Sequence, residues 1–327
     1  MKQALLVGMP RSGTTWLAKG VDRQKNTIYF HEPDSEEKIN IPHFIEDTEV
    51  ENHIDTVRQY LPGIINNKSL KVIGRLPFYP KEKLSSIALN TNKAKIYLAK
   101  IANSLFKKIN IKKASISLPK SQDNVIFWKS IESPARLNVL AQANPEMPIA
   151  YVVRHPCGVI NSELRGISSH EFGDNLPIYQ AFGLMEELVN SSVGKALNFD
   201  MDQFKALTPA QRLAVRWLIY NEKALNDVKN NDNIKLFIYE DICSDPKREF
   251  KKIYDHLGLK DNGEIEQYVL ETTSSETETY YSIQKDPLHS AMKWRKQLPA
   301  EDQLAIQDIL KGTRSYQLFE QYNTPSA

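Results

Sequence analysis

The 327-residue sequence has few cysteines, no long hydrophobic run and no excess of charge of one sign. Its two cysteines, Cys157 and Cys243, are too few for a disulfide framework and favour a reducing compartment. No run approaches the roughly 18 apolar residues of a membrane span. The apolar run after Lys2 is also too short for the core of a signal peptide. These features predict a soluble, cytoplasmic protein without a transmembrane segment.

Charge and histidine patterning argue against two further kinds of site. Lysine and arginine together number 42 against 40 acidic residues, so bulk electrostatics does not predict a nucleic-acid partner. The seven histidines show no paired spacing, and neither cysteine has a neighbouring ligand pattern. No metal site is therefore expected.

The most informative stretch follows a short apolar run at residues 4–7. Gly8 and Gly13 stand five positions apart and precede two threonines and a helical pattern, which outlines a phosphate-binding loop. Small residues let backbone N–H groups converge on an anion, and the following helix adds its positive N-terminal dipole. Thr14 replaces the lysine of nucleotide triphosphatases, and the cation lies inside the loop as Arg11. The loop thus predicts a phosphate-like ligand whose charge arrangement differs from that of a Mg-bound triphosphate.

Short runs of β-forming residues recur between helical patterns along the chain. They lie at residues 4–7, 27–30, 125–128, 149–153 and 234–239. Near-continuous apolar strands separated by helices indicate a parallel sheet covered on both faces. We therefore expect a three-layer α/β fold of the P-loop type, with about five parallel strands flanked by helices. Ligands of such sheets bind at the carboxyl ends of the strands.

Polar and charged side chains follow three of these strands. His31 and Glu32 end the second run, directly before a proline, and either side chain could take a proton from a hydroxyl group. Lys129 follows the third run. Arg154 ends the fourth, and Ser162 lies eight residues later, about two turns into a helix. A buried strand that ends in arginine needs a partner for that charge.

Residues 10–16, Pro-Arg-Ser-Gly-Thr-Thr-Trp, resemble the 5′-phosphosulfate loop of sulfotransferases that use 3′-phosphoadenosine 5′-phosphosulfate (PAPS). The resemblance extends to bacterial members and to the carbohydrate and tyrosylprotein branch, whose catalytic glutamate follows the loop arginine by twenty-one residues. Glu32 follows Arg11 by twenty-one residues, so it is the favoured base, with His31 as the alternative or as an orienting partner. The resemblance implies a donor-binding loop made of Arg11, Ser12, Gly13, Thr14, Thr15 and Trp16, with the tryptophan against the adenine ring.

The same resemblance assigns roles near the other strand ends. Lys129 would reach the transferred sulfonate or the bridging oxygen. Arg154 and Ser162 would bind the 3′-phosphate, a site that an ATP-using enzyme does not need. In relatives a basic loop near the C-terminus closes over this phosphate, which points to Arg295 and Lys296 in this chain.

The resemblance implies in-line transfer of a sulfonate group from PAPS to an acceptor hydroxyl, with a carboxylate base and no metal. A saccharide, a glycolipid or a small metabolite is the expected acceptor, and the sequence leaves open whether it is anionic. One alternative is a P-loop kinase or NTPase-like phosphotransferase, which Thr14 in place of lysine disfavours. The other is a catalytically silent nucleotide-binding relative.

The chain at 1–327 is expected to form one domain, with a helical insertion on the acceptor side at 35–124 and a helical region at 165–230. From Lys83 to Lys120 the insertion holds nine lysines and no acidic residue. One predicted helical face there is apolar, formed by Leu98, Ile101, Leu105 and Ile109. Three interpretations remain open for this basic helix: a docked helix with a solvated face, a site for an anionic acceptor, or a peripheral membrane contact.

Overall fold

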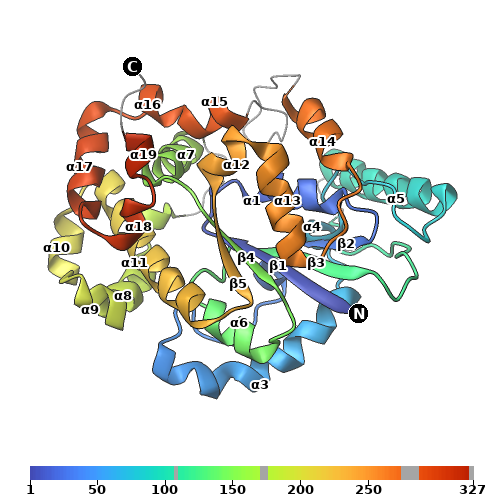
Figure 1. Cartoon of the computed structure of the whole chain (residues 1–327), viewed down its shortest axis with the longest axis horizontal. Coiled ribbons are helices and arrows are strands. Elements are labelled where there is room, and N and C mark those ends of the chain that lie inside the picture. Colours follow the sequence, from blue (N-terminus) through green and yellow to red (C-terminus); the bar gives the residue numbers. More distant parts are fainter. Residues whose placement is uncertain (107–109, 170–175, 274–286, 324–327) are drawn as a thin grey trace.

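The computed structural model describes residues 1–106, 110–169, 176–273 and 287–323. Five parallel strands form a sheet in the order β2-β3-β1-β4-β5 (Figure 1). The strands are β1 (Lys2–Gly8), β2 (Thr27–His31), β3 (Val125–Ser130), β4 (Ile149–Val153) and β5 (Ile234–Ile238). Every predicted run therefore contains a strand, and the predicted parallel sheet is confirmed.

Alternation along the strands builds two separate cores, one on each face of the sheet. Leu5 and Val7 of β1 point into one apolar cluster, while Ala4 and Leu6 point into the other. The second cluster is covered by α1 (Thr14–Asp22), α12 (Tyr239–Ser244), α13 (Pro246–Leu257) and α14 (Glu264–Thr273). The first is covered by α3 (Val50–Tyr60), α6 (Leu137–Ala143), α7 (Pro156–Ser168) and α11 (Pro209–Asn230). Helices on both faces confirm the three-layer α/β fold.

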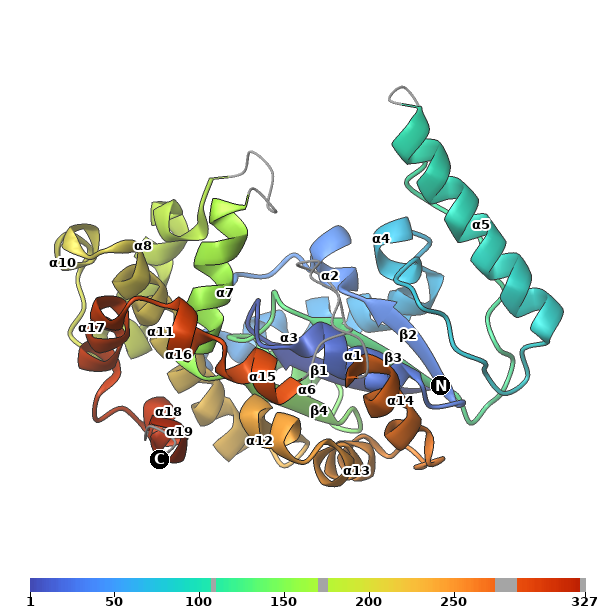
Figure 2. The ribbon, with the colours of Figure 1, turned by 90° about the horizontal axis from the view of Figure 1, so that it is seen from above.

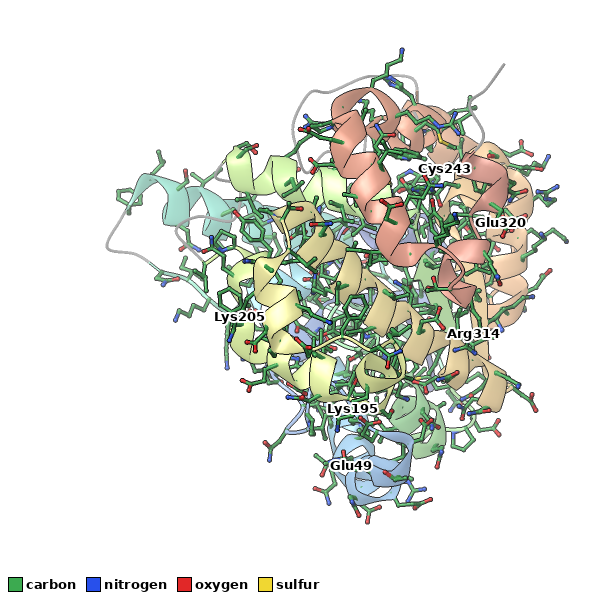
Figure 3. All side chains as sticks on the ribbon, turned by 90° about the vertical axis from the view of Figure 1, so that its left-hand side faces the viewer. Glu49, Lys195, Lys205, Cys243, Arg314 and Glu320 are labelled. Carbon is green, nitrogen blue, oxygen red and sulfur yellow. The ribbon has the colours of Figure 1, made fainter. Side chains whose placement is uncertain are left out.

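A helical region beyond β4 packs around α11, which is the longest helix of this layer. It contains η3 (Ile178–Gln180), α8 (Phe182–Asn190), α9 (Ser192–Ala196) and α10 (Met201–Ala206). The C-terminal helices α17 (Ala300–Leu310), α18 (Arg314–Gln317) and α19 (Glu320–Asn323) complete it. Figure 3 shows that charged side chains such as Lys195, Lys205 and Arg314 cover this side of the molecule. Among the described residues, no helix combines the length and the apolar character that crossing a bilayer requires.

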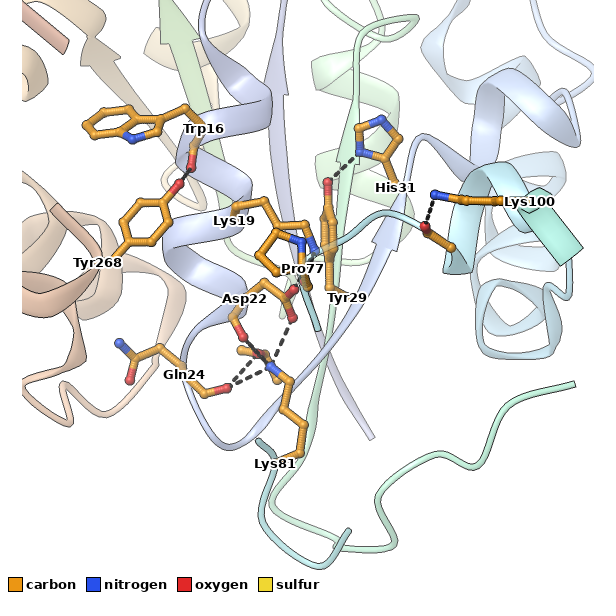
Figure 4. A network of polar contacts seen from close by, with 12 residues as sticks. Trp16, Lys19, Asp22, Gln24, Tyr29, His31, Pro77, Lys81, Lys100 and Tyr268 are labelled. Atoms are coloured by element: carbon orange, nitrogen blue, oxygen red, sulfur yellow. Dashed lines mark hydrogen bonds and ion pairs between the residues drawn. The ribbon is translucent and has the colours of Figure 1, made fainter. Parts of the chain in front are cut away.

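The segment between β2 and β3 is mostly helical. Besides α3 it contains α2 (Pro33–Glu36), η1 (Asp47–Glu49), η2 (Leu61–Asn66), α4 (Leu70–Ile73) and α5 (Ser86–Leu105). A buried ionic network fastens this segment to α1 (Figure 4). In it Asp22 of α1 binds Lys19 at 2.8 Å and Lys81 at 2.9 Å, and Lys19 also donates to the carbonyl of Pro77 at 3.0 Å.

Helix α5 projects from the body of the molecule (Figure 2). The predicted apolar stripe does not form its packed face, because Leu98 is 66% exposed and Leu105 is 69% exposed. The buried face instead contains Asn92 and Ile96. Asn92 explains the difference: its amide exchanges two hydrogen bonds with the backbone of Ser117, at 2.8 and 2.9 Å, and turns that face inward. Residue 109, the fourth member of the predicted stripe, lies outside the described residues.

Candidate active site

The register of the parallel strands brings three strand ends together. His31 of β2 and Leu6 of β1 both pair with Lys129 of β3, which lies between them. The residues that follow these positions therefore emerge at one edge of the sheet. This geometry places Glu32, Lys129 and the loop after β1 side by side.

The loop after β1 turns tightly into α1. Gly13 has φ 81°, and a Cβ atom there would lie 2.1 Å from the ring of Tyr239, so only glycine fits. Arg11 has φ 70°, an uncommon conformation for a residue with a side chain. Because α1 begins at Thr14, the free N–H groups of its first turn point into this loop. The loop thus has the form of an anion cradle.

Lys129 is the centre of the polar contacts at this edge. Its side chain is buried, and Nζ lies 3.3 Å from both Thr14 Oγ1 and Thr15 Oγ1 and forms an ion pair with Glu32. Burial lowers the pKa of Lys129, and the Glu32 carboxylate opposes that shift. The ammonium group of Lys129, at the end of β3, therefore contacts both the loop after β1 and the residue that follows β2.

His31 and Glu32 differ in what their side chains offer. The Tyr29 hydroxyl lies 2.7 Å from His31 Nδ1, and burial raises the pKa of Tyr29 well above its usual value, so this hydroxyl stays protonated. When it donates to Nδ1, the ring proton lies on Nε2, 3.6 Å from Glu32 Oε1. Burial, followed by the charge of Lys129, lowers the pKa of His31 to about 2. His31 is thus a neutral ring, and its one unprotonated nitrogen already accepts the hydrogen bond from Tyr29. The Glu32 side chain, in contrast, is 22% exposed.

Arg11, Arg154 and Ser162 also lie together. Arg11 Nε donates to Ser162 Oγ at 3.0 Å, and Arg154 donates to the carbonyl of Arg11 at 2.9 Å and to that of Ser290 at 3.0 Å. The Arg154 guanidinium also stands over the ring of Tyr239, 4.9 Å from its centre. Among the described residues, its buried Nε has no hydrogen-bond partner. A cationic group of this kind can take an anion as an additional partner.

Two of the remaining predicted donor-binding residues, Trp16 and Arg295, have protein partners. Trp16 is 7% exposed, its indole is stacked near Tyr268, and its Nε1 donates to Thr272 Oγ1 at 3.2 Å. Arg295 donates to the carbonyl of Tyr322 at 2.6 Å, while Lys296 is exposed. The prediction of a loop around these two cations was wrong, because the segment forms α15 (Pro287–Met292) and α16 (Trp294–Gln297). Gln297 accepts a hydrogen bond from Asn161 at 3.0 Å, which holds α16 against the helix of Ser162.

Sequence reasoning missed several residues near the site. A cavity of about 210 Å³ opens beside Met9 and Pro10 of the loop and also contains Glu163 and Arg216. Tyr239, which lies against Gly13 and under Arg154, is the last residue of the fifth apolar run, and nothing in that run marks it as a site residue. The single local signal was that Glu163 directly follows Ser162, whereas Arg216 and Tyr239 reach the site through the packing of distant segments.

Comparison with known proteins places the chain in a family. A family model described as "Sulfotransferase family" matches residues 4–263. Carbohydrate sulfotransferase 2 of mouse and that of human are each 25% identical over 150 residues, covering 45% of this chain and 24% of theirs. The match therefore spans about a quarter of the length of these curated relatives.

Solved sulfotransferase structures resemble the chain at low identity. The sulfotransferase domain of the Synechococcus PCC 7002 olefin synthase is 16% identical with a TM-score of 0.48, covering 99% of this chain and 96% of that one. Mouse sulfotransferase SULT7A1, complexed with PAP, is 13% identical with a TM-score of 0.45, covering 98% and 89%. Because the family model covers most of the sequence, from the first strand through the fifth, the chain belongs to the sulfotransferase family.

Proposed function

We propose that the protein transfers a sulfonate group from PAPS to a hydroxyl group of a saccharide, a glycolipid or a small metabolite. Sulfonate transfer follows from the family, and the donor, the acceptor and the residue roles are our proposal. The observation that carries it is the position of Lys129, whose ammonium group links the threonines of the anion cradle to Glu32. A cation between an anion site and a carboxylate suits group transfer to a hydroxyl, because it puts charge stabilisation and a possible base at the same place.

The donor would contact the protein at four places. Backbone N–H groups of Gly13, Thr14 and Thr15 would hold the 5′-phosphosulfate at the N-terminus of α1, next to Ser12, whose own N–H donates to the Met9 carbonyl at 3.1 Å. Arg154, whose buried Nε lacks a partner among the described residues, would bind the 3′-phosphate together with Ser162. Arg295 and Lys296 would add positive charge from α16, which is held against α7. Trp16 would meet the adenine ring with the small part of the indole that stays exposed.

Each of the chain's own groups would have a separate role in the reaction. Bound PAPS supplies an activated sulfonate, so one S–O bond forms to the acceptor while the S–O bond to the 5′-phosphate breaks. Glu32 would accept the acceptor's proton, since the lone pair of neutral His31 is engaged by Tyr29. Arg11 and Lys129 would offset the charge that develops on the leaving oxygen. The transferred group carries one negative charge rather than the two of a terminal phosphate, so two side-chain cations are matched to it.

Calorimetric binding of 3′-phosphoadenosine 5′-phosphate (PAP), beside ADP and ATP with and without Mg²⁺, tests this proposal. We expect a strong preference for PAP, lost in Arg154→Ala and kept in the control Arg248→Ala, whose side chain is 62% exposed on α13. Equal or tighter binding of ATP would overturn the donor assignment and favour the phosphotransferase. PAP binding without sulfonate transfer to any hydroxyl acceptor would instead favour a catalytically silent relative.

A further inference from the structure

The cavity of about 210 Å³ lies directly beside the proposed reaction centre. Met9 and Pro10, which line it, precede Arg11 in the loop. Glu163, which also lines the cavity, follows Ser162, whose hydroxyl accepts the hydrogen bond from Arg11. A molecule in this cavity would therefore lie against the loop that carries Arg11, the cation that we assign to the leaving oxygen.

Two buried charged side chains, Glu163 and Arg216, line the cavity. Glu163 is 9% exposed and Arg216 is 8% exposed. In the part of the chain that the structure describes, neither side chain makes a hydrogen bond or forms an ion pair, and Arg216 Nε is fully enclosed without a partner. The Arg216 guanidinium lies 5.6 Å from the centre of the Tyr220 ring, which fixes its direction along α11. Buried polar groups are normally hydrogen-bonded, so an unpaired guanidinium nitrogen in the same cavity as a carboxylate without a hydrogen bond suits a ligand that bridges the two side chains.

The other lining residues indicate the charge and the polarity of that ligand. Two carboxylates, Glu132 and Glu163, and one guanidinium, that of Arg216, line the cavity, so its lining carries one more negative than positive charge. An acidic molecule would be repelled there, whereas hydroxyl groups can donate to the carboxylates and accept from Arg216. The remaining walls are largely apolar, with Met9, Pro10, Ile131, Pro134, Ile178 and Leu184. Such walls suit the apolar face of a saccharide ring.

We propose that this cavity is the acceptor site, and that Glu163 and Arg216 hold a neutral, hydroxyl-rich acceptor of the saccharide type. This inference rests on the proposed function and deepens it, because it commits to the class of acceptor. Burial raises the pKa of Glu163, while the charges of Arg216 and Arg11 oppose that shift. Both cations thus lie close enough to act on the same carboxylate, as one binding site requires.

The experiment compares two probes of similar size that differ in charge, p-nitrophenyl β-glucoside and p-nitrophenyl β-glucuronide. Binding of each to the protein–PAP complex is measured by ligand-observed NMR. PAP affinity is measured by calorimetry in the same samples. We expect the glucoside to bind the unmodified protein at least about tenfold more tightly than the glucuronide, since one repulsive charge is worth a factor of that size.

Variants identify the residues responsible. Glu163→Gln and Arg216→Gln should weaken glucoside binding by about tenfold, the loss of one charge-assisted hydrogen bond, with PAP affinity unchanged. The matched control is Glu186→Gln, an exposed glutamate on α8, which should bind both ligands as the unmodified protein does. Unchanged PAP affinity also reports that each variant is folded.

Two sets of outcomes separate this inference from the proposed function. If PAP binds but neither glycoside does, if the glucuronide binds as tightly as the glucoside, or if both variants bind like the control, the acceptor assignment is overturned and the donor assignment stands. If the unmodified protein does not bind PAP, the proposed function fails, and the acceptor assignment that rests on it fails too.

Discussion

Replacing Glu240 by glutamine should remove one measurable contribution to the pH dependence of folding. Glu240 is fully buried in α12, directly after β5. Its Oε1 accepts a hydrogen bond from the backbone N–H of His155 at 3.1 Å, and its Oε2 has no partner among the described residues. Burial raises the pKa of this carboxyl from 4.5 to about 7, although the nearby Arg154 guanidinium opposes the shift.

The size of the effect follows from that shift. One pKa unit corresponds to about 1.4 kcal/mol, so a rise of about 2.5 units gives about 3 kcal/mol. The folded state holds this proton more tightly than the unfolded state does, so the contribution to stability is complete below the unfolded pKa of 4.5. It declines as the pH rises and is lost above about pH 7. Glutamine keeps the acceptor for the His155 N–H group but does not titrate.

Urea unfolding at a series of values from about pH 5 to about pH 8 measures the difference. The free energy of unfolding of Glu240→Gln, minus that of the unmodified protein, should increase by about 2 to 3 kcal/mol across this range. Glu301→Gln, an exposed position in the first turn of α17, should show no such increase. Parallel curves for Glu240→Gln and the unmodified protein would refute the claim that this carboxyl is protonated in the folded protein at low pH.

Three further predictions concern the base, the loop cation and the buried network. Glu32→Gln should lower the rate of sulfonate transfer by about 10²–10⁴, and His31→Asn by much less; the reverse order would make the histidine the base. Arg11→Ala should lower turnover by about 10²–10³ while calorimetry still detects PAP binding, and unchanged turnover would contradict its role. Asp22→Asn should lower the free energy of unfolding by about 3–5 kcal/mol in urea, because two buried lysines lose their counter-charge; a loss near zero would show that water screens the network.

The sheet and the anion cradle could be predicted because their signals are local. Each strand is a short apolar run whose alternate residues meet two different cores, and this pattern is visible without knowing the neighbours. The loop needs glycine where φ is positive at Gly13 and where the Tyr239 ring approaches. The spacing of Gly8 and Gly13 in the sequence is therefore enough to predict the anion cradle. The ends of parallel strands must meet at one edge, so the grouping of Glu32 with Lys129 also follows from the sequence.

The packed face of α5 could not be predicted, because hydrophobic periodicity identifies a stripe but not what covers it. Asn92, which is polar, is buried because the backbone of Ser117 satisfies both of its hydrogen-bonding groups. Leu98 and Leu105 stay exposed because, within the described residues, no element packs over them. Apolar side chains decide which face of a helix is buried only when no specific interaction, such as the hydrogen bonds of Asn92, favours another face.

The two halves of the proposed site differ in predictability for one physical reason. The donor half is built from strand ends, where register fixes every side chain relative to its neighbours, so one sequence signal locates several residues at once. The acceptor half depends on α11, whose Arg216 reaches the loop only through helix packing across the first core. Packing of this kind tolerates changes of helix direction and residue type, whereas the cradle does not. A fold arranged in this way can keep one donor chemistry while different cavity walls select different acceptors, so Glu163 and Arg216 are where we expect the specificity of this chain to reside.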